Sequence, residues 1–307
     1  MKQKTKNTIL TDGGLETDLI FNHRIELEHF AAFPLLENRN HLQILENYYR
    51  DYLELAKLNG TGFILESPTW RANLDWGKAL GYDEQNLKRV NKLAIQKMKQ
   101  LKQEYKTCIE NVMVSGQIGP RGDGYKVDTA MNPAEAQAYH NLQVGAFETA
   151  KVDMVTAITM TYIDEALGIV ESAKNHKIPV VISFTVELDG SLPSGETLEQ
   201  AITAIDKATE NYPKYYMINC AHPTHFMHLL EGAKSWKNRI QGLRANASCK
   251  SHAELDESTE LDVGNKIELG QLHRELQQLL PNLEVFGGCC GTDASHVKAI
   301  CDHISLV

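Results

Sequence analysis

The chain has 307 residues, of which 42% are hydrophobic and 23% charged, and its formal net charge is −9 at pH 7. This length and apolar content suffice for one large domain or two small ones. The acidic excess argues against a nucleic acid or an anionic membrane surface as partner, because clustered Lys and Arg bind such partners.

The sequence contains no apolar run of the roughly 20 residues that cross a bilayer. Residues 1–7 are polar and are not followed by the hydrophobic stretch of a secretory signal, so we expect a cytoplasmic protein. Six cysteines are too few for a disulfide scaffold in a chain of this length. They are better interpreted as thiols or metal ligands.

Short β-branched runs alternate along the chain with longer segments whose apolar residues recur at helical spacing. The predicted strands are residues 8–12, 62–66, 112–117, 154–159, 180–186, 216–220, 240–245 and 285–288. A helix is expected after each strand, and the clearest candidates are residues 41–58, 84–105, 133–151, 165–176, 198–210 and 294–303.

Eight strand–helix units with strands buried on both faces predict an α/β fold of the (β/α)₈ TIM type, as a single domain over residues 1–307. The main competitor is an open doubly wound sheet. Its dinucleotide fingerprint G-x-G-x-x-G does not match the first turn, Asp12-Gly13-Gly14-Leu15-Glu16. The number of units therefore favours the barrel, whose catalytic residues sit where strands end.

Two of these strand ends carry cysteines. Cys220 closes the sixth predicted strand, and the adjacent Cys289 and Cys290 follow the eighth. The two ends should lie roughly 10 Å apart, so inward-pointing thiols can share one ion. Three thiolates favour zinc and leave a fourth position for water or substrate. Buried free thiols, or a disulfide between the adjacent pair, remain alternatives.

The other cysteines and a histidine cluster are assigned weaker roles. Cys108 and Cys301 are interpreted as structural thiols, and Cys249 is ambiguous because it follows the seventh predicted strand. His222 lies close to Cys220 and is a candidate for substrate contact. The imidazoles three and six residues further on are expected at the surface, namely His225 and His228.

Three blocks of the sequence resemble the signatures of the homocysteine S-methyltransferase family. They are Asp12-Gly13-Gly14, Asn219-Cys220 and Gly287-Gly288-Cys289-Cys290-Gly291-Thr292, and the resemblance spans nearly the whole chain. It implies a zinc-dependent barrel that moves a methyl group from S-methylmethionine, betaine or methyl-folate to homocysteine, giving methionine. The implied zinc ligands are Cys220, Cys289 and Cys290, and the implied acceptor-binding residues are Asp12, Gly13, Gly14, Glu66 and Asn219.

The implied mechanism assigns no protein base, because the zinc-bound thiolate of the substrate is itself the nucleophile. Aromatic faces and carboxylates would hold a cationic donor, and Trp70, Tyr162 and Glu187 are loop residues of the right kind. Two segments depart from the family pattern. Ile158 stands where the family has an acid that grips the acceptor's amino group, and Arg244-Ala245-Asn246 replaces a usual Tyr-Pro-Asn.

These departures leave other functions open. The acceptor can be another thiol or a selenol, with Glu187 or Glu66 in place of the missing acid. A zinc hydrolase or lyase is disfavoured, because three thiolates make the metal a poorer Lewis acid. A non-enzymatic zinc- or redox-sensing barrel is a further alternative. The expected partners are a small thiol and a small methyl donor, and the sequence does not indicate an oligomeric state.

Overall fold

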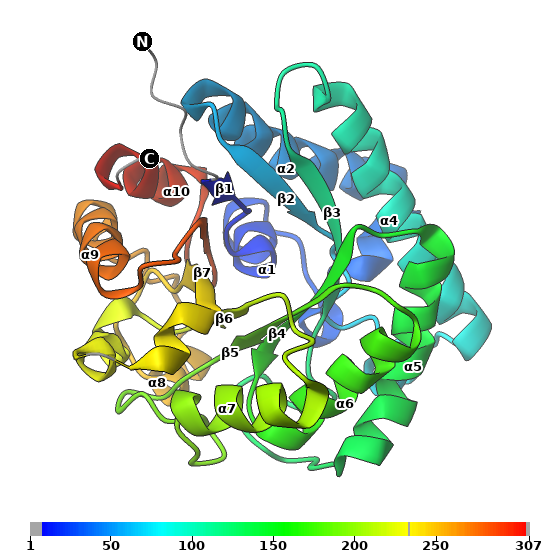
Figure 1. The fold of residues 1–307 in the computed structure, drawn as a ribbon. Coiled ribbons are helices and arrows are strands. Elements are labelled where there is room, and N and C mark those ends of the chain that lie inside the picture. The colour runs from blue at the N-terminus through cyan, green and yellow to red at the C-terminus, as the bar shows by residue number, and fades with distance from the viewer. Residues whose placement is uncertain (1–7, 233, 305–307) are drawn as a thin grey trace.

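The computed structural model describes residues 8–232 and 234–304, so residues 1–7, 233 and 305–307 of the predicted domain lie outside the described part. Eight parallel strands form a closed barrel in which β1 to β8 follow one another in chain order (Figure 1). They are β1 Ile9–Leu10, β2 Gly62–Glu66, β3 Val112–Ile118, β4 Met154–Met160, β5 Val180–Phe184, β6 Tyr216–Asn219, β7 Ile240–Ala245 and β8 Val285–Gly288. The predicted single-domain barrel is confirmed.

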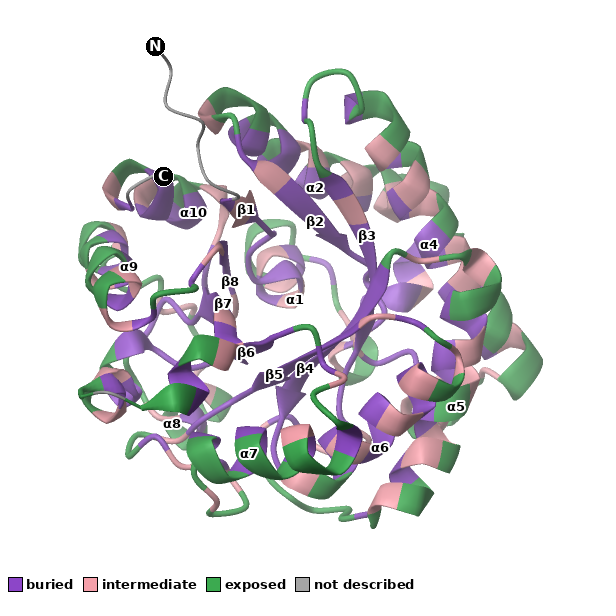
Figure 2. Ribbon diagram, viewed as in Figure 1, coloured by how far each residue is buried: buried purple, intermediate pink, exposed green. Residues whose placement is uncertain are grey.

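The short strand β1 closes the barrel. Ile9 is in register with Gly62 of β2 on one side and with Val285 of β8 on the other. The strands are buried almost throughout, since side chains fill the barrel and helices cover its outer face (Figure 2). Parallel strands buried on both faces read as near-continuous apolar runs, which is why all eight could be found in the sequence.

The outer ring consists of helices whose ends carry recognisable signals. Asn132 and Glu135 form a capping box at the start of α5, and Gly60 ends α2 with a φ of 66°. Asp293 caps α10 in the same way as Asn132 caps α5. The α-helices are α1 Leu15–Thr17, α2 Arg39–Asn59, α3 Leu74–Ala79, α4 Glu84–Tyr105, α5 Pro133–Ala150, α6 Ile163–Asn175, α7 Leu198–Thr209, α8 His252–Asp256, α9 Lys266–Leu279 and α10 Ala294–His303. The six clearest helix predictions are therefore confirmed to within two residues at each end.

The segment after β6 departs from the prediction of a helix after every strand. Three short 3-10 helices occupy it, η4 Pro223–His225, η5 Met227–Leu230 and η6 Ser235–Arg239. Pro223 starts the first of them, and Gly232 adopts a φ of 75° between the second and third. These tight turns bury His225, whose Nε2 lies 3.0 Å from the carbonyl oxygen of Cys249. The prediction that His225 is a surface residue is wrong, whereas His228 is exposed as predicted.

Three further short helices lie in the connection between β1 and α2. They are η1 Asp18–Asn22, η2 Glu28–Phe30 and η3 Phe33–Glu37. No helix among the described residues is both long and apolar enough to cross a membrane.

Candidate active site

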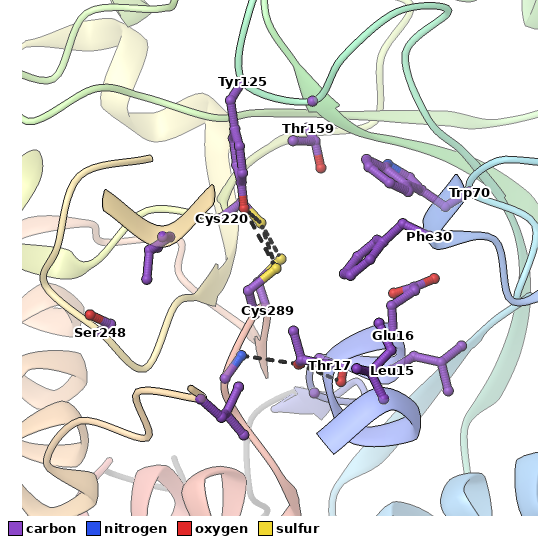
Figure 3. A pocket seen from close by; sticks show the side chains of 18 of the residues that line it. Leu15, Glu16, Thr17, Phe30, Trp70, Tyr125, Thr159, Cys220, Ser248 and Cys289 are labelled. Atoms are coloured by element: carbon purple, nitrogen blue, oxygen red, sulfur yellow. Dashed lines mark hydrogen bonds between the residues drawn. The ribbon is translucent and has the colours of Figure 1, made fainter. Parts of the chain in front are cut away.

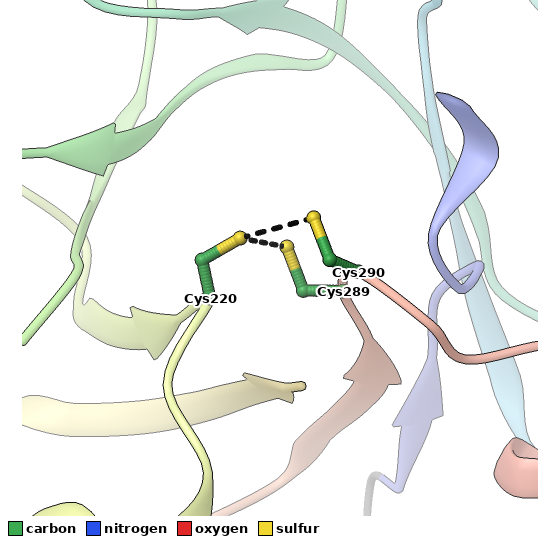
Figure 4. Close-up of side chains that lie close together, drawn as sticks. All are labelled: Cys220, Cys289 and Cys290. Carbon is green, nitrogen blue, oxygen red and sulfur yellow. Dashed lines mark hydrogen bonds between the residues drawn. The ribbon is translucent and has the colours of Figure 1, made fainter. Parts of the chain in front are cut away.

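Three thiols meet at the carboxyl-terminal ends of β6 and β8 (Figure 4). The sulfur of Cys220 lies 2.7 Å from that of Cys289 and 3.6 Å from that of Cys290, and all three sulfurs lie within 4.8 Å of one another. The sequence-based expectation that these cysteines come together is met by the fold. Among the described residues, this is the group of His, Cys, Asp and Glu side chains found with spacing suited to a metal ion.

The backbone holds the adjacent cysteines in place through glycine and a strand partner. A Cβ on Gly288 would come within 1.9 Å of the Thr292 hydroxyl oxygen, so only glycine fits before the pair. Gly291 after the pair adopts a φ of 79°. The amide of Cys289 donates to the carbonyl of Ala245 at 2.8 Å. Both sulfurs can therefore face the barrel axis from consecutive positions.

Cys220 is held in a less common conformation. Its φ is 54°, and Thr159, at the end of β4, has a φ of 61°. Asn219 lies between them: its Oδ1 accepts from the Thr159 amide at 2.9 Å, and its Nδ2 is 3.8 Å from the Cys289 sulfur. Positive φ values at non-glycine residues cluster at functional sites. Asn219 thus positions Thr159 and a thiol. It lies outside the cavity lining, although the resemblance implied that it binds the acceptor.

Two loops close over the thiols. The Tyr125 hydroxyl, from the loop after β3, is 3.6 Å from the sulfurs of both Cys220 and Cys290. Its ring stacks on His252, with centroids 4.0 Å apart, and His252 Nε2 lies 2.8 Å from the Cys220 carbonyl oxygen. Glu187 pairs with the other nitrogen of His252 at 3.3 Å. Tyr125 and His252 were missed in the sequence because loop paths depend on tertiary contacts.

The three thiols form hydrogen bonds with one another and lie near the buried guanidinium of Arg244. Hydrogen bonds from Cys220 and Cys290, together with the nearby Arg244 guanidinium, hold the pKa of Cys289 well below its usual range. Hydrogen bonds with Cys289 and Cys290 raise the pKa of Cys220 well above its ordinary value. The cluster therefore already favours one thiolate.

The thiols open into a cavity of about 430 Å³, which Figure 3 shows from close by. Of the residues implied to bind the acceptor, Asp12, Gly13 and Gly14 line it, and Ile158 lines it as well. A Cβ on Gly14 would approach the Cys289 carbonyl oxygen to 2.5 Å, so this glycine lets the first loop pack against the thiol pair. Trp70 is the one of the three suggested donor-binding residues that lines the cavity.

Asp12, Glu66 and Arg244 form an interior charge cluster at this end of the barrel. Arg244 Nη2 lies 2.9 Å from Asp12 Oδ1, and the Tyr48 hydroxyl donates to Asp12 Oδ2 at 3.2 Å. Burial raises the pKa of Asp12, and Arg244 lowers it again only in part. The Asp12 carboxylate is thus occupied by the protein's own groups.

Glu66 is buried inside the barrel, outside the cavity lining. Burial raises its pKa to about 7, against the opposing charge of Arg244 and hydrogen bonds from Ser115 and Thr156. Burial would lower the pKa of Arg244, but Asp12 and Glu66 raise it above its ordinary value. Glu66 therefore acts on the site through the charge of Arg244, which lines the cavity.

Several other residues suggested from the sequence lie away from the cavity. The Tyr162 hydroxyl accepts from the Met131 amide, and His222 is buried against Thr224. Cys301 is buried in α10 as expected for a structural thiol. Cys108 is exposed, as is Cys249, so the prediction that Cys108 is a structural thiol is wrong. It lies in the turn between α4 and β3, where the chain runs over the surface.

The charged residues of the cavity that were missed in the sequence include Glu16 and Arg71. Glu16 follows the first strand and Arg71 directly follows Trp70, and both line the cavity. Their positions after β1 and β2 were the available signal, because barrel sites are built from such loops. Neither Glu187 nor Glu66 lies in the lining where a substitute acid was sought.

A family model described as homocysteine S-methyltransferase matches residues 9–304 of the chain. Among solved structures, the chain is similar to the metallated form of the homocysteine methyltransferase MmuM from Escherichia coli, with 20% identity, 98% of this chain and 96% of that chain covered, and a TM-score of 0.73. The oxidized form of the same protein gives 19% identity, coverage of 97% and 96%, and a TM-score of 0.75. Comparison with curated proteins gave no match. At this identity the structural likeness establishes the barrel fold.

Proposed function

The chain belongs to the homocysteine S-methyltransferase family, and on that premise we propose that it moves a methyl group from an onium donor to a thiol, with zinc held by Cys220, Cys289 and Cys290. Family membership establishes an enzyme of thiol S-methyl transfer. The metal, the donor and the acceptor are the proposed parts. The observation that carries the proposal is the convergence of three sulfurs from two strand ends, within 4.8 Å of one another, beside the cavity.

The residues present fit a zinc ion. Sulfurs that share one tetrahedral zinc lie about 3.8 Å apart, given zinc–sulfur bonds of about 2.3 Å. The 3.6 Å between Cys220 and Cys290 matches this spacing. The 2.7 Å between Cys220 and Cys289 is shorter by about 1 Å, so one of these side chains must rotate outward by that amount to ligate. When bound, zinc would lower the pKa of the acceptor's thiol and so supply a thiolate at neutral pH.

The chain's own residues position the two substrates. Gly13 and Gly14 line the cavity beside the thiols and are proposed to contact the acceptor, with Asp12 oriented by Arg244. In the transfer, a new bond forms between the acceptor sulfur and the methyl carbon while the bond from that carbon to the onium atom breaks. Its electron pair stays on the leaving atom, which becomes neutral, and the thiol proton goes to water. Holding both substrates in line removes the entropy cost of their encounter.

Homocysteine is the proposed acceptor, with methionine as product. A second class of acceptor is favoured by the charges near the thiols. The Asp12 carboxylate is occupied by Arg244, Thr11 and Tyr48, and the apolar Ile158 lines the cavity nearby. At this position an α-ammonium group would find no free carboxylate, and it would depend on another acid of the lining, such as Glu16. A thiol without that group, such as 4-mercaptobutanoate, is therefore the second candidate.

The metal is tested first. Purified, reduced chain should contain about one zinc per molecule, and Cys290→Ala should lose it, because two thiolates bind zinc far more weakly than three. Cys108→Ser is the matched control, since it removes an exposed thiol and should leave the zinc content unchanged. A fully folded wild type that takes up no zinc would refute the metal site.

The reaction is tested by crossing acceptors with donors. Homocysteine and 4-mercaptobutanoate are each incubated with S-methylmethionine and with betaine, and the S-methyl products are measured by mass spectrometry. Methionine formation supports the proposed acceptor, and preference for 4-mercaptobutanoate supports the second. No methylated thiol from any combination of zinc-loaded enzyme and substrates contradicts the proposed function.

A further inference from the structure

Arg71 is a buried cation fixed at the edge of the cavity. It directly follows Trp70 in the loop after β2, lines the cavity and is only 7% exposed. Its guanidinium carbon lies 4.1 Å from the ring centroids of both Trp70 and Trp76, and Nη1 donates to the Gly122 carbonyl at 2.7 Å. Two indole faces and one hydrogen bond thus hold the guanidinium in a single place.

Three acids, Asp123, Glu16 and Asp128, lie near enough to raise the pKa of Arg71, but none of them forms an ion pair with it. Across residues 8–232 and 234–304 no carboxylate forms an ion pair with it, and its buried Nε has no hydrogen-bond partner there. Burial lowers its pKa to about 10, so the side chain is still cationic at neutral pH. A buried charge without a partner is costly. A bound anion would offset that cost.

Glu16 and the rings of Phe30 and Trp70 line the cavity together with Arg71. Glu16 lies close enough to influence the pKa of Arg71, yet within the described residues it forms no ion pair with Arg71 or any other cation. The rings of Phe30 and Trp70 meet edge to face with centroids 6.3 Å apart. Figure 3 shows Glu16, Phe30 and Trp70 across the cavity from Cys220 and Cys289. We call Glu16, Phe30, Trp70 and Arg71 the aromatic wall.

We propose that the aromatic wall binds the methyl donor as a zwitterion, with Arg71 taking a carboxylate of the donor and Glu16 and the rings taking its onium centre. The inference rests on the proposed function and assigns the recognition of the donor's carboxylate to Arg71. In an in-line transfer the leaving atom lies beyond the methyl carbon as seen from the acceptor sulfur. An acceptor sulfur beside the three cysteines therefore directs the leaving onium atom toward the opposite side of the cavity, where this wall lies.

Arg71 is then a specificity-determining residue. A planar guanidinium forms two parallel hydrogen bonds to a carboxylate, whereas a neutral amide can accept only weakly. Glu16 and the rings favour any cationic centre, through charge and through the ring faces. The wall thus selects donors that carry a carboxylate near the onium centre over donors that carry the onium centre alone.

Binding is measured directly, without acceptor, so that no methyl transfer takes place. Isothermal titration calorimetry compares S-methylmethionine with its carboxamide, and betaine with betaine amide. Within each pair the onium centre is kept and the negative charge is removed. The wild type should bind at least one acid tenfold or more tightly than its amide, the range expected for a charge-assisted hydrogen bond. Arg71→Met should reduce that ratio to twofold or less while leaving affinity for the amide unchanged.

Arg121→Met is the matched control. Arg121 also packs on an aromatic ring, 4.8 Å from the centroid of Tyr139, but it pairs with Asp75 at 2.7 Å and lies outside the cavity lining. It should keep the full acid-to-amide ratio. Arg71→Lys keeps the charge and should retain part of the ratio. This variant, and the wild-type comparison itself, test the inference even if Arg71→Met does not fold.

The inference is overturned if the wild type binds acid and amide equally, or if Arg71→Met keeps the wild-type ratio. It is also overturned if Arg71→Met raises the KM of the thiol acceptor and leaves the donor's KM unchanged, since Arg71 would then serve the acceptor. Binding and catalysis separate the two proposals. Selective binding of the acid forms of the donors without any methyl transfer would contradict the proposed function alone. Methyl transfer from acid and amide donors with equal kcat/KM would contradict this inference alone.

Discussion

The interior charge cluster and the aromatic wall both contain buried ionisable groups, but they differ in how those groups are partnered. In the interior cluster, Arg244 lies 2.9 Å from Asp12 and also donates to the carbonyls of Gly13 and Gly288. In the aromatic wall, Arg71 and Glu16 have no ion-pair partner among the described residues. Charges that the protein satisfies itself hold the loops in place, whereas charges left unsatisfied beside a cavity are available to a ligand.

The difference follows from where each group sits in the barrel. Arg244 belongs to β7 and borders the cavity from within the barrel, where Asp12 already pairs with it. Arg71 lies in the loop after β2 and Glu16 in the short helix α1 after β1, at the end of the barrel where the cavity opens. Stability and function should therefore respond differently when each arginine is removed.

The largest expected effect is on stability. Arg244→Met leaves Asp12 and Glu66 buried without their cation, and breaking a buried pair in this way costs about 3–5 kcal/mol in free energy of unfolding. Arg71→Met should cost about 1 kcal/mol or less, because it removes a charge that has no ion-pair partner and keeps a long side chain between two indoles. Urea unfolding of the metal-free, reduced proteins at pH 7 measures both. Equal losses in the two variants would remove the distinction between the regions.

A smaller effect is expected from Glu66, whose pKa burial raises from 4.5 to about 7. A carboxyl group with a raised folded-state pKa binds its proton more tightly when folded, so its contribution to stability is full below the unfolded pKa and is lost as the pH rises through about 7. Glu66→Gln has no such titration. Its stability relative to wild type should improve by about 2–3 kcal/mol between pH 5 and pH 8, measured by urea unfolding. A relative stability independent of pH would contradict the raised pKa.

The sequence could predict the barrel and the thiol cluster because both follow from regular structure. Strands buried on both faces give apolar runs, and closure of the barrel brings Cys220 near Cys289 and Cys290. The aromatic wall depends on loop conformation. Arg71 lines the cavity because it packs between the rings of Trp70 and Trp76. Phe30 lines it with a backbone φ of 58°. Hydrophobic periodicity carries no information about such positions.

The orientation of acidic residues shows the same limit. Glu66 ends β2 and was expected to contact substrate, but the alternation of side chains along the strand turns it into the barrel interior. Glu16, which was not singled out, lines the cavity from the short helix α1. One residue of shift along a strand or helix separates a cavity-lining group from a buried one, and sequence patterns alone do not fix that choice for a polar residue.

The smallest expected effect is on the affinity for the methyl donor, and it distinguishes Glu16 from Glu66. Burial raises the pKa of Glu16 to about 7, with Cys289 and Asp12 raising it further and Arg244 lowering it. Ionised Glu16 attracts the onium centre and protonated Glu16 does not, so donor affinity in the wild type should rise several-fold from pH 6 to pH 8. Glu16→Gln should abolish that rise, and Glu66→Gln should keep it because Glu66 lies outside the lining. Calorimetric titration of zinc-loaded protein with S-methylmethionine, without acceptor, measures the difference. A rise that disappears in Glu66→Gln and persists in Glu16→Gln would reverse the assignment, since the donor would then depend on the interior cluster and not on the aromatic wall.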